Sequence, residues 1–152
     1  MQRDSFFIVT GSINVGKTEL VRALSETAQF LHSSELAGKL IEEQISNGGK
    51  LIPWIDRYAF ENELLRRRIA EYASIRPERV CFFDRGVPEA IAFLRSEARE
   101  VPAIFFSAAR KYRYNRAVFF LPPWREIYRN MSTRPQTFLE AKRVGELLRD
   151  LY

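Results

Sequence analysis

Gly11-Ser-Ile-Asn-Val-Gly16-Lys17-Thr18 is the stretch that decides the fold, because it fits the phosphate-loop pattern G-x-x-x-x-G-K-[ST]. The apolar run from Ser5 to Thr10, rich in aromatic and β-branched residues, precedes it and is typical of a buried parallel strand. The segment from Glu19 to Leu24 follows it with helical spacing. The sequence therefore predicts a strand, a phosphate loop and a helix in that order.

The spacing of the loop suits a chain of phosphate groups. Its glycines let the backbone wrap around phosphate oxygens, so that successive amide groups and the positive end of the following helix face one anion. We expect Lys17 to reach the β- and γ-phosphates of a nucleotide and the Thr18 hydroxyl to bind Mg²⁺. The residues expected to hold the nucleotide are Gly11, Ser12, Asn14, Val15, Gly16, Lys17 and Thr18.

One hydroxyl is not enough for a magnesium site, so a carboxylate is expected at the end of a neighbouring strand. Asp84 follows the apolar run Val80-Cys-Phe-Phe83 and is the best candidate. The alternative is that Asp84 caps a helix after Gly86-Val87-Pro88. The expected metal residues are therefore Thr18 and Asp84.

Length and composition describe an ordinary folded domain. The chain has 152 residues, enough for one domain with a core, and 46% of them are apolar and 28% charged. These values exclude disordered and collagen-like chains. No apolar run approaches the roughly 18–20 residues that span a bilayer, and no signal peptide is recognisable, so we expect a cytoplasmic protein without membrane contact. The single cysteine, Cys81, is expected in a buried strand.

The net charge of +5 indicates an affinity for anions. Nucleotides, phosphorylated metabolites and nucleic acids all fit this charge. Tyr112-Arg113-Tyr114-Asn115-Arg116 is the segment that would favour nucleic acid, but it is better explained as a helix end leading into a strand. We therefore expect a nucleotide as partner and no nucleic acid.

Strand-like and helix-like segments alternate along the chain. The expected strands are 5–10, 30–33, 79–84 and 117–121. Besides the helix after the loop, the expected helices are 36–44, 88–99, 104–112, one opening at Pro53 and one beginning at Pro135. This alternation predicts an α/β fold with a mainly parallel sheet flanked by helices, in which ligands bind at the carboxyl ends of the strands.

The helix expected to open at Pro53 has a broad apolar face. Trp54 lies on that face together with Tyr58, Leu64, Leu65, Ile69 and Tyr72, which favours a place in the core over a stacking role. The arginines of Leu65-Arg66-Arg67-Arg68-Ile69 are expected on a solvated face.

Several segments of the chain carry a family resemblance. They are the phosphate loop, Glu35 with Leu40-Ile41-Glu42-Glu43-Gln44, Pro53-Trp54-Ile55-Asp56-Arg57, Phe83-Asp84-Arg85-Gly86, and Phe120-Leu121-Pro122-Pro123-Trp124 with Ile127-Tyr128-Arg129. Together they resemble the AAA-domain-like predicted ATPases related to the nucleoside-kinase-like domain of NadR. The resemblance covers nearly the whole chain. It implies one nucleotide-binding domain over 1–152, with the three-layer P-loop NTPase fold of small kinases rather than of ring-forming motors.

The resemblance also implies roles for five residues or segments. Asp84 and Arg85 correspond to the pair that kinase-like proteins place beside the acceptor: Asp84 toward Mg²⁺ or the acceptor hydroxyl, Arg85 toward an anionic substrate. Residues 122–135 resemble a lid. In it Arg129 and Arg134 would stabilise the charge of the transferring phosphoryl group. A surface ion pair for Arg85 and solvated positions for the lid arginines are the alternatives.

The acceptor side of the resemblance rests on two further carboxylates. Glu35 and Asp56 lie where these folds place polar residues that bind the acceptor, so with Arg85 they are the expected substrate residues. The alternatives are helix capping at Glu35 and an exposed position for Asp56. Relatives have an aspartate shortly after the lid Tyr-Arg pair, which this chain lacks after Tyr128-Arg129. The family's further C-terminal strand is expected to be absent after Tyr152.

The expected activity follows from the loop and the resemblance together. The chain is expected to bind ATP or GTP with Mg²⁺ and to transfer or hydrolyse the γ-phosphate. A small-molecule acceptor would make it a kinase-like phosphotransferase. The alternative is an NTPase or a nucleotide-switched adaptor without such an acceptor.

Overall fold

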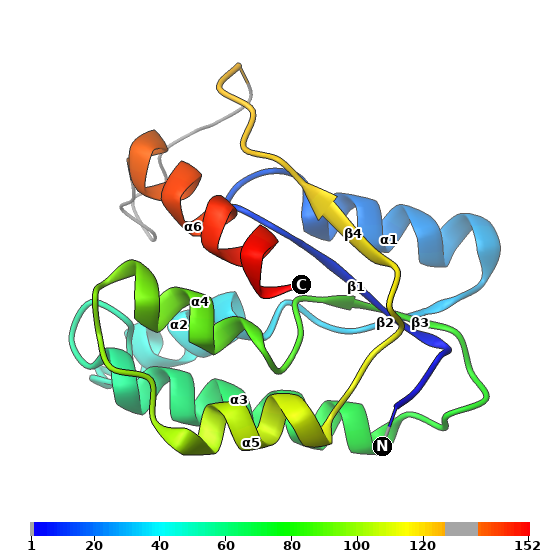
Figure 1. Cartoon of the computed structure of the whole chain (residues 1–152), viewed down its shortest axis with the longest axis horizontal. Coiled ribbons are helices and arrows are strands. Elements are labelled where there is room, and N and C mark those ends of the chain that lie inside the picture. The colour runs from blue at the N-terminus through cyan, green and yellow to red at the C-terminus, as the bar shows by residue number, and fades with distance from the viewer. Residues whose placement is uncertain (1, 127–136) are drawn as a thin grey trace.

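A computed structural model describes residues 2–126 and 137–152. Its centre is a sheet of four parallel strands in the order β2-β3-β1-β4 (Figure 1). The strands are β1 (Phe6–Gly11), β2 (Leu31–His32), β3 (Cys81–Asp84) and β4 (Val118–Leu121). The register pairs Val9 with Asp84 and Gly11 with Leu121, so the carboxyl ends of β1, β3 and β4 lie at one edge of the sheet.

Helices cover both faces of this sheet, which makes three layers (Figure 1). The helices are α1 (Lys17–Ala28), α2 (Leu36–Ser46), α3 (Arg57–Ser74), α4 (Glu89–Ser96), α5 (Ala103–Lys111) and α6 (Phe138–Leu151). One face packs against α1, and the opposite face packs against α3, α4, α5 and α6. The α/β fold predicted from the alternation of segments is confirmed.

The alternation of side chains along the strands explains why both faces need a cover. Phe6 and Ile8 point into a large core with Cys81 and Phe83, beneath α3 and α4. The intervening residue Val9 packs on the other face against α1. Continuous apolar strands therefore have both faces buried, as is usual for parallel sheets. Cys81 is a buried, free thiol in β3, as predicted.

The helix expected from Pro53 begins four residues later, at Arg57. Before it the chain forms a turn, in which the amides of Ile55 and Asp56 both donate to the Ile52 carbonyl. Trp54 stands on this turn and is 49% exposed, so its predicted place in the helix core is wrong. The cause is a better helix start at Asp56, whose carboxylate accepts a hydrogen bond from the Ala59 amide at 3.0 Å.

The last helix, α6, starts at Phe138 with Thr137 as its N-cap, and the expected start at Pro135 lies outside the described residues. Thr137 and Glu140 form a reciprocal capping box, which defines this start. Within 2–126 and 137–152, no helix has the length and apolar character needed to cross a membrane.

Candidate functional site

The phosphate loop, residues 11–18, joins β1 to α1 with two glycines in conformations that other residues avoid. Gly11 has φ +138°, and a side chain there would run into the carbonyl of Leu121 on β4. Gly16 has φ +82° and precedes α1 without any side-chain cap. The first amides of α1 are therefore not capped by the preceding side chain, as an anion site at a helix N-terminus requires.

The Lys17 side chain is buried inside the phosphate loop. It is 7% exposed, and its Nζ donates a hydrogen bond to the Ser12 carbonyl at 2.5 Å. Burial, followed by the positive charge of Arg85, lowers the pKa of Lys17 to about 7. A buried ammonium with one backbone partner is suited to receive an anion, which would supply the missing negative charge.

Asp84 meets the phosphate loop at the carboxyl end of β3. The Thr18 hydroxyl donates to Asp84 Oδ2 at 2.7 Å, and the Asp84 amide donates to the Ser33 hydroxyl at 2.8 Å. The other carboxylate oxygen, Oδ1, is buried and has no hydrogen-bond partner among the described residues. The two candidate metal residues are thus in direct contact, and one acceptor atom remains available.

This arrangement fits magnesium better than a metal held by protein alone. In the described part of the chain, no three His, Cys, Asp or Glu residues cluster in a way that could hold a metal ion. Mg²⁺ beside nucleotide phosphates keeps several waters and needs only one or two protein ligands. The Thr18 hydroxyl and the unpartnered Asp84 oxygen supply such a minimal set.

Arg85 follows Asp84 with a strained backbone. Its φ of +75° is a left-handed conformation, uncommon for a residue with a side chain, and the side chain is 8% exposed. Its Nη1 forms an ion pair with Glu89 Oε2 at 2.6 Å, and its guanidinium lies 5.0 Å from the ring centre of Phe93. Arg85 does form an ion pair, but the alternative of a surface ion pair is wrong about its location, because Glu89 is fully buried.

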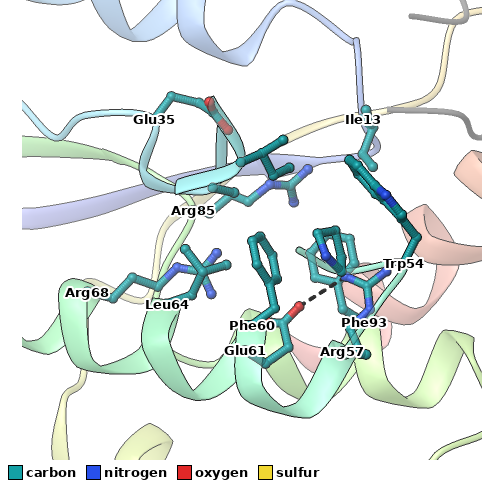
Figure 2. Close-up of a pocket in the computed structure, with 13 residues that line it drawn as sticks. Ile13, Glu35, Trp54, Arg57, Phe60, Glu61, Leu64, Arg68, Arg85 and Phe93 are labelled. Carbon is teal, nitrogen blue, oxygen red and sulfur yellow. Dashed lines mark hydrogen bonds and ion pairs between the residues drawn. The ribbon is translucent and has the colours of Figure 1, made fainter. Parts of the chain in front are cut away.

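A pocket of about 100 Å³, called the side pocket here, borders the phosphate loop. Ile13 of the loop lines it, and α3 forms one wall, with Glu35 and Arg85 across from that wall (Figure 2). Its charged lining residues are Glu35, Arg57, Glu61, Arg68 and Arg85. Its aromatic lining residues are Trp54, Phe60 and Phe93.

Two of the expected substrate residues line this pocket and one does not. Arg85 and Glu35 are lining residues, and the Glu35 carboxylate also accepts a hydrogen bond from the Gly38 amide at 2.9 Å, where it caps α2. Asp56 is not among the lining residues and caps α3 instead. Arg129 and Arg134, and most of the expected lid, lie outside the described residues.

Sequence reasoning missed the charged residues that α3 contributes. Arg68 was expected on a solvated face, but it is 5% exposed, and Glu61 is 1% exposed. Arg66 does lie in solvent, with 68% of its side chain exposed. The available signal was spacing: Glu61 and Arg68 lie three or four residues from the buried Leu64 and Leu65, on the same helix face.

The strand, loop and helix geometry agrees with comparison to known families. The sequence matches the AAA domain family over residues 6–152. The chain belongs to this AAA family. It is accordingly a P-loop protein that binds nucleotide. A search of curated proteins finds no match for the chain.

Proposed function

We propose that this AAA-family protein binds Mg-ATP or Mg-GTP on its phosphate loop and transfers the γ-phosphate to a small molecule in the side pocket. The observation that carries the proposal is the position of Asp84 and Arg85. The first of these neighbours is hydrogen-bonded to Thr18 of the loop, and the second lines the side pocket. Two neighbouring residues therefore connect the nucleotide side to the side pocket.

On the nucleotide side, the loop amides and Lys17 hold the phosphates. Lys17 gives up its bond to the Ser12 carbonyl and donates to the β- and γ-phosphate oxygens instead. Thr18 and Asp84 hold the Mg²⁺, which neutralises negative charge on the phosphates when bound. The residues that we propose to surround the phosphates are Gly11, Ser12, Asn14, Val15, Gly16, Lys17 and Thr18.

On the acceptor side, a hydroxyl of the small molecule attacks the γ-phosphorus. The hydroxyl oxygen forms the new P–O bond, the bond to the β–γ bridging oxygen breaks, and the nucleoside diphosphate leaves with those electrons. Asp84 accepts the hydroxyl proton or orders the water around Mg²⁺. Arg85, with Arg129 and Arg134 from the proposed lid 122–135, stabilises charge on the transferring group. Glu35, which lines the side pocket, is proposed to orient the acceptor. Asp56, a candidate for the same role from the sequence, does not line the pocket and holds the start of α3 instead.

The experiment follows γ-labelled ATP and GTP, with Mg²⁺ and a metabolite extract, in the wild type and in Lys17→Ala. We expect the label to appear on a small molecule with the wild type, and transfer to fall at least 100-fold in the variant, because the phosphates lose their main cation. Lys50→Ala, at an exposed lysine outside the loop, is the matched control. Label found only in free phosphate would instead establish an NTPase or a switch.

A further inference from the structure

Arg68 is a buried cation for which the described residues provide no ion pair. It projects from α3, is 5% exposed, and lines the side pocket. Its Nη1 is buried without a hydrogen bond, and no ion pair within 4.0 Å reaches it from the described residues. Burying a guanidinium is unfavourable unless hydrogen bonds and opposite charge compensate it. The position of Arg68 therefore calls for an acceptor of its hydrogen bonds.

The other arginines of the pocket are already paired. Arg57 contacts Glu61 at 3.3 Å and also pairs with Glu97. Arg85 pairs with Glu89 at 2.6 Å. Neither pairing uses the guanidinium of Arg68, which leaves Arg68 as the lining arginine without a bonded carboxylate in the described structure.

Glu61 lies on the same helix and interacts electrostatically with Arg68, but it forms neither a hydrogen bond nor an ion pair with it. Its Oε1 accepts from Arg57, and its Oε2 is buried without a partner among the described residues. Burial raises the pKa of Glu61, and the charge of Arg68 offsets this only in part. Arg68 and Glu61 thus line the same pocket, and each has one buried side-chain atom without a hydrogen-bond partner among the described residues.

The shape of the pocket limits what can connect these groups. Its volume of about 100 Å³ accommodates a small charged group, and the pocket is open to solvent on one side rather than enclosed. Apolar side chains of Ile41, Phe60 and Leu64 form part of the lining. In Figure 2, Arg68 and Glu61 rise from α3 on the side of the pocket opposite Arg85. A compact anionic group fits this space and this charge.

We propose that the acceptor is an anion whose phosphate or carboxylate group binds Arg68 in the side pocket, while a hydroxyl or amino group of the same molecule donates to the Glu61 carboxylate. This inference rests on the proposed function, because it takes the side pocket as the acceptor site. It narrows the substrate class to small phosphorylated or carboxylated molecules. Arg68 is then a specificity residue that excludes neutral alcohols, since a neutral ligand leaves its buried charge uncompensated.

The test measures binding rather than turnover. The protein is saturated with Mg²⁺ and a non-hydrolysable ATP or GTP analogue, so that added anions cannot occupy the phosphate loop. Glycerol 3-phosphate, glycerate and glycerol are then titrated at constant ionic strength, with thermal unfolding and calorimetry as readouts. We expect glycerol 3-phosphate or glycerate to bind the wild type saturably and glycerol not to bind. The anion that binds more tightly identifies phosphate or carboxylate as the recognised group.

Variants of α3 connect this binding to Arg68. Arg68→Met keeps the aliphatic stem and should lower the affinity for the anion at least tenfold. Arg68→Lys should lower this affinity severalfold, because the planar fork of the guanidinium is lost. Arg66→Met is the matched control, since Arg66 lies two residues away on the same helix and in solvent. Equal anion affinity in Arg68→Met, or no anion binding to the nucleotide-bound wild type, would overturn the inference.

Binding of the nucleotide analogue distinguishes a failure of the inference about Arg68 from a failure of the proposed function. Binding of the analogue to Arg68→Met with wild-type affinity shows that the variant is folded and its loop intact. If the analogue does not bind the wild type, the proposed function fails. If the analogue binds and the anions do not distinguish Arg68→Met from the wild type, only the inference about Arg68 fails.

Discussion

At the scale of single residues, the site is defined by charges that burial leaves under-compensated. Lys17 has a pKa of about 7, mainly because it is buried, and Asp84 Oδ1 and Arg68 Nη1 have no hydrogen-bond partners in the described structure. Natural cores rarely leave such groups unsatisfied. Groups of this kind near a phosphate loop are best explained as ligands for molecules that bind there.

The lowered pKa of Lys17 predicts that nucleotide binding takes up a proton. In the free protein Lys17 loses its proton as the pH rises through about 7, whereas bound phosphates favour the charged form and raise its pKa. Nucleotide affinity should therefore decline above pH 7, by up to about tenfold per pH unit. Calorimetry at pH 8 in buffers of different ionisation enthalpy measures this uptake directly.

The controls for this prediction are two lysine variants. Lys17→Met should bind nucleotide weakly and with an affinity that does not depend on pH in this way. Lys50→Met changes an exposed lysine and should keep the wild-type proton uptake. Wild-type binding at pH 8 without any proton uptake would contradict the pKa assigned to Lys17.

At the scale of elements, the sheet order brings distant segments to one edge. Because β3 lies directly beside β1, with Val9 opposite Asp84, the end of β3 reaches the start of α1. The hydrogen bond between Thr18 and Asp84 is the result of this pairing. The strand order explains why residues so far apart in sequence meet beside the phosphate loop.

Asp84→Asn should raise the Mg²⁺ concentration needed for nucleotide binding about tenfold or more. The asparagine oxygen can still accept the Thr18 hydrogen bond at the position of Oδ2, so the fold should persist. The charge that attracts Mg²⁺ and its water is lost, however. Fluorescence titration of a nucleotide analogue at a series of Mg²⁺ concentrations measures the shift. Asp150→Asn, at an exposed carboxylate of α6, should match the wild type, and an unchanged Asp84→Asn would remove this residue from the metal site.

The elements themselves could largely be predicted from the sequence, because each strand is a short apolar run with a clear stop. The run 79–84 ends at Asp84 and the run 117–121 stops before Pro122, and β3 and β4 end at those positions. The side pocket could not be predicted in this way. The burial of Arg68 depends on which helices pack around α3, and the exposure of Trp54 depends on a helix start at Asp56.

At the scale of the whole molecule, the phosphate loop and the side pocket share one core. α3 lines the side pocket and packs through Leu65 and Tyr72 on the strand residues Phe6 and Phe83, whose strands lead to the phosphate loop. Unfolding of this core would therefore disrupt the phosphate loop and the side pocket together. We therefore expect the described elements to unfold as one cooperative unit, as small single domains usually do.

Heating should show a single transition, the same by far-ultraviolet circular dichroism and by tryptophan fluorescence. Trp54 at the side pocket and Trp124 after β4 report on two separate parts of the molecule. At 100 times its dissociation constant, Mg-nucleotide should add about 2.7 kcal/mol to the free energy of unfolding. For a chain of this size, that raises Tm by roughly 5–10 °C. Both probes should report the same increase in Tm. Lys17→Ala should show the same single transition, with no increase in Tm when the nucleotide is added. Two separate transitions, or a nucleotide shift in only one probe, would mean that the side pocket is not held by the core that supports the phosphate loop.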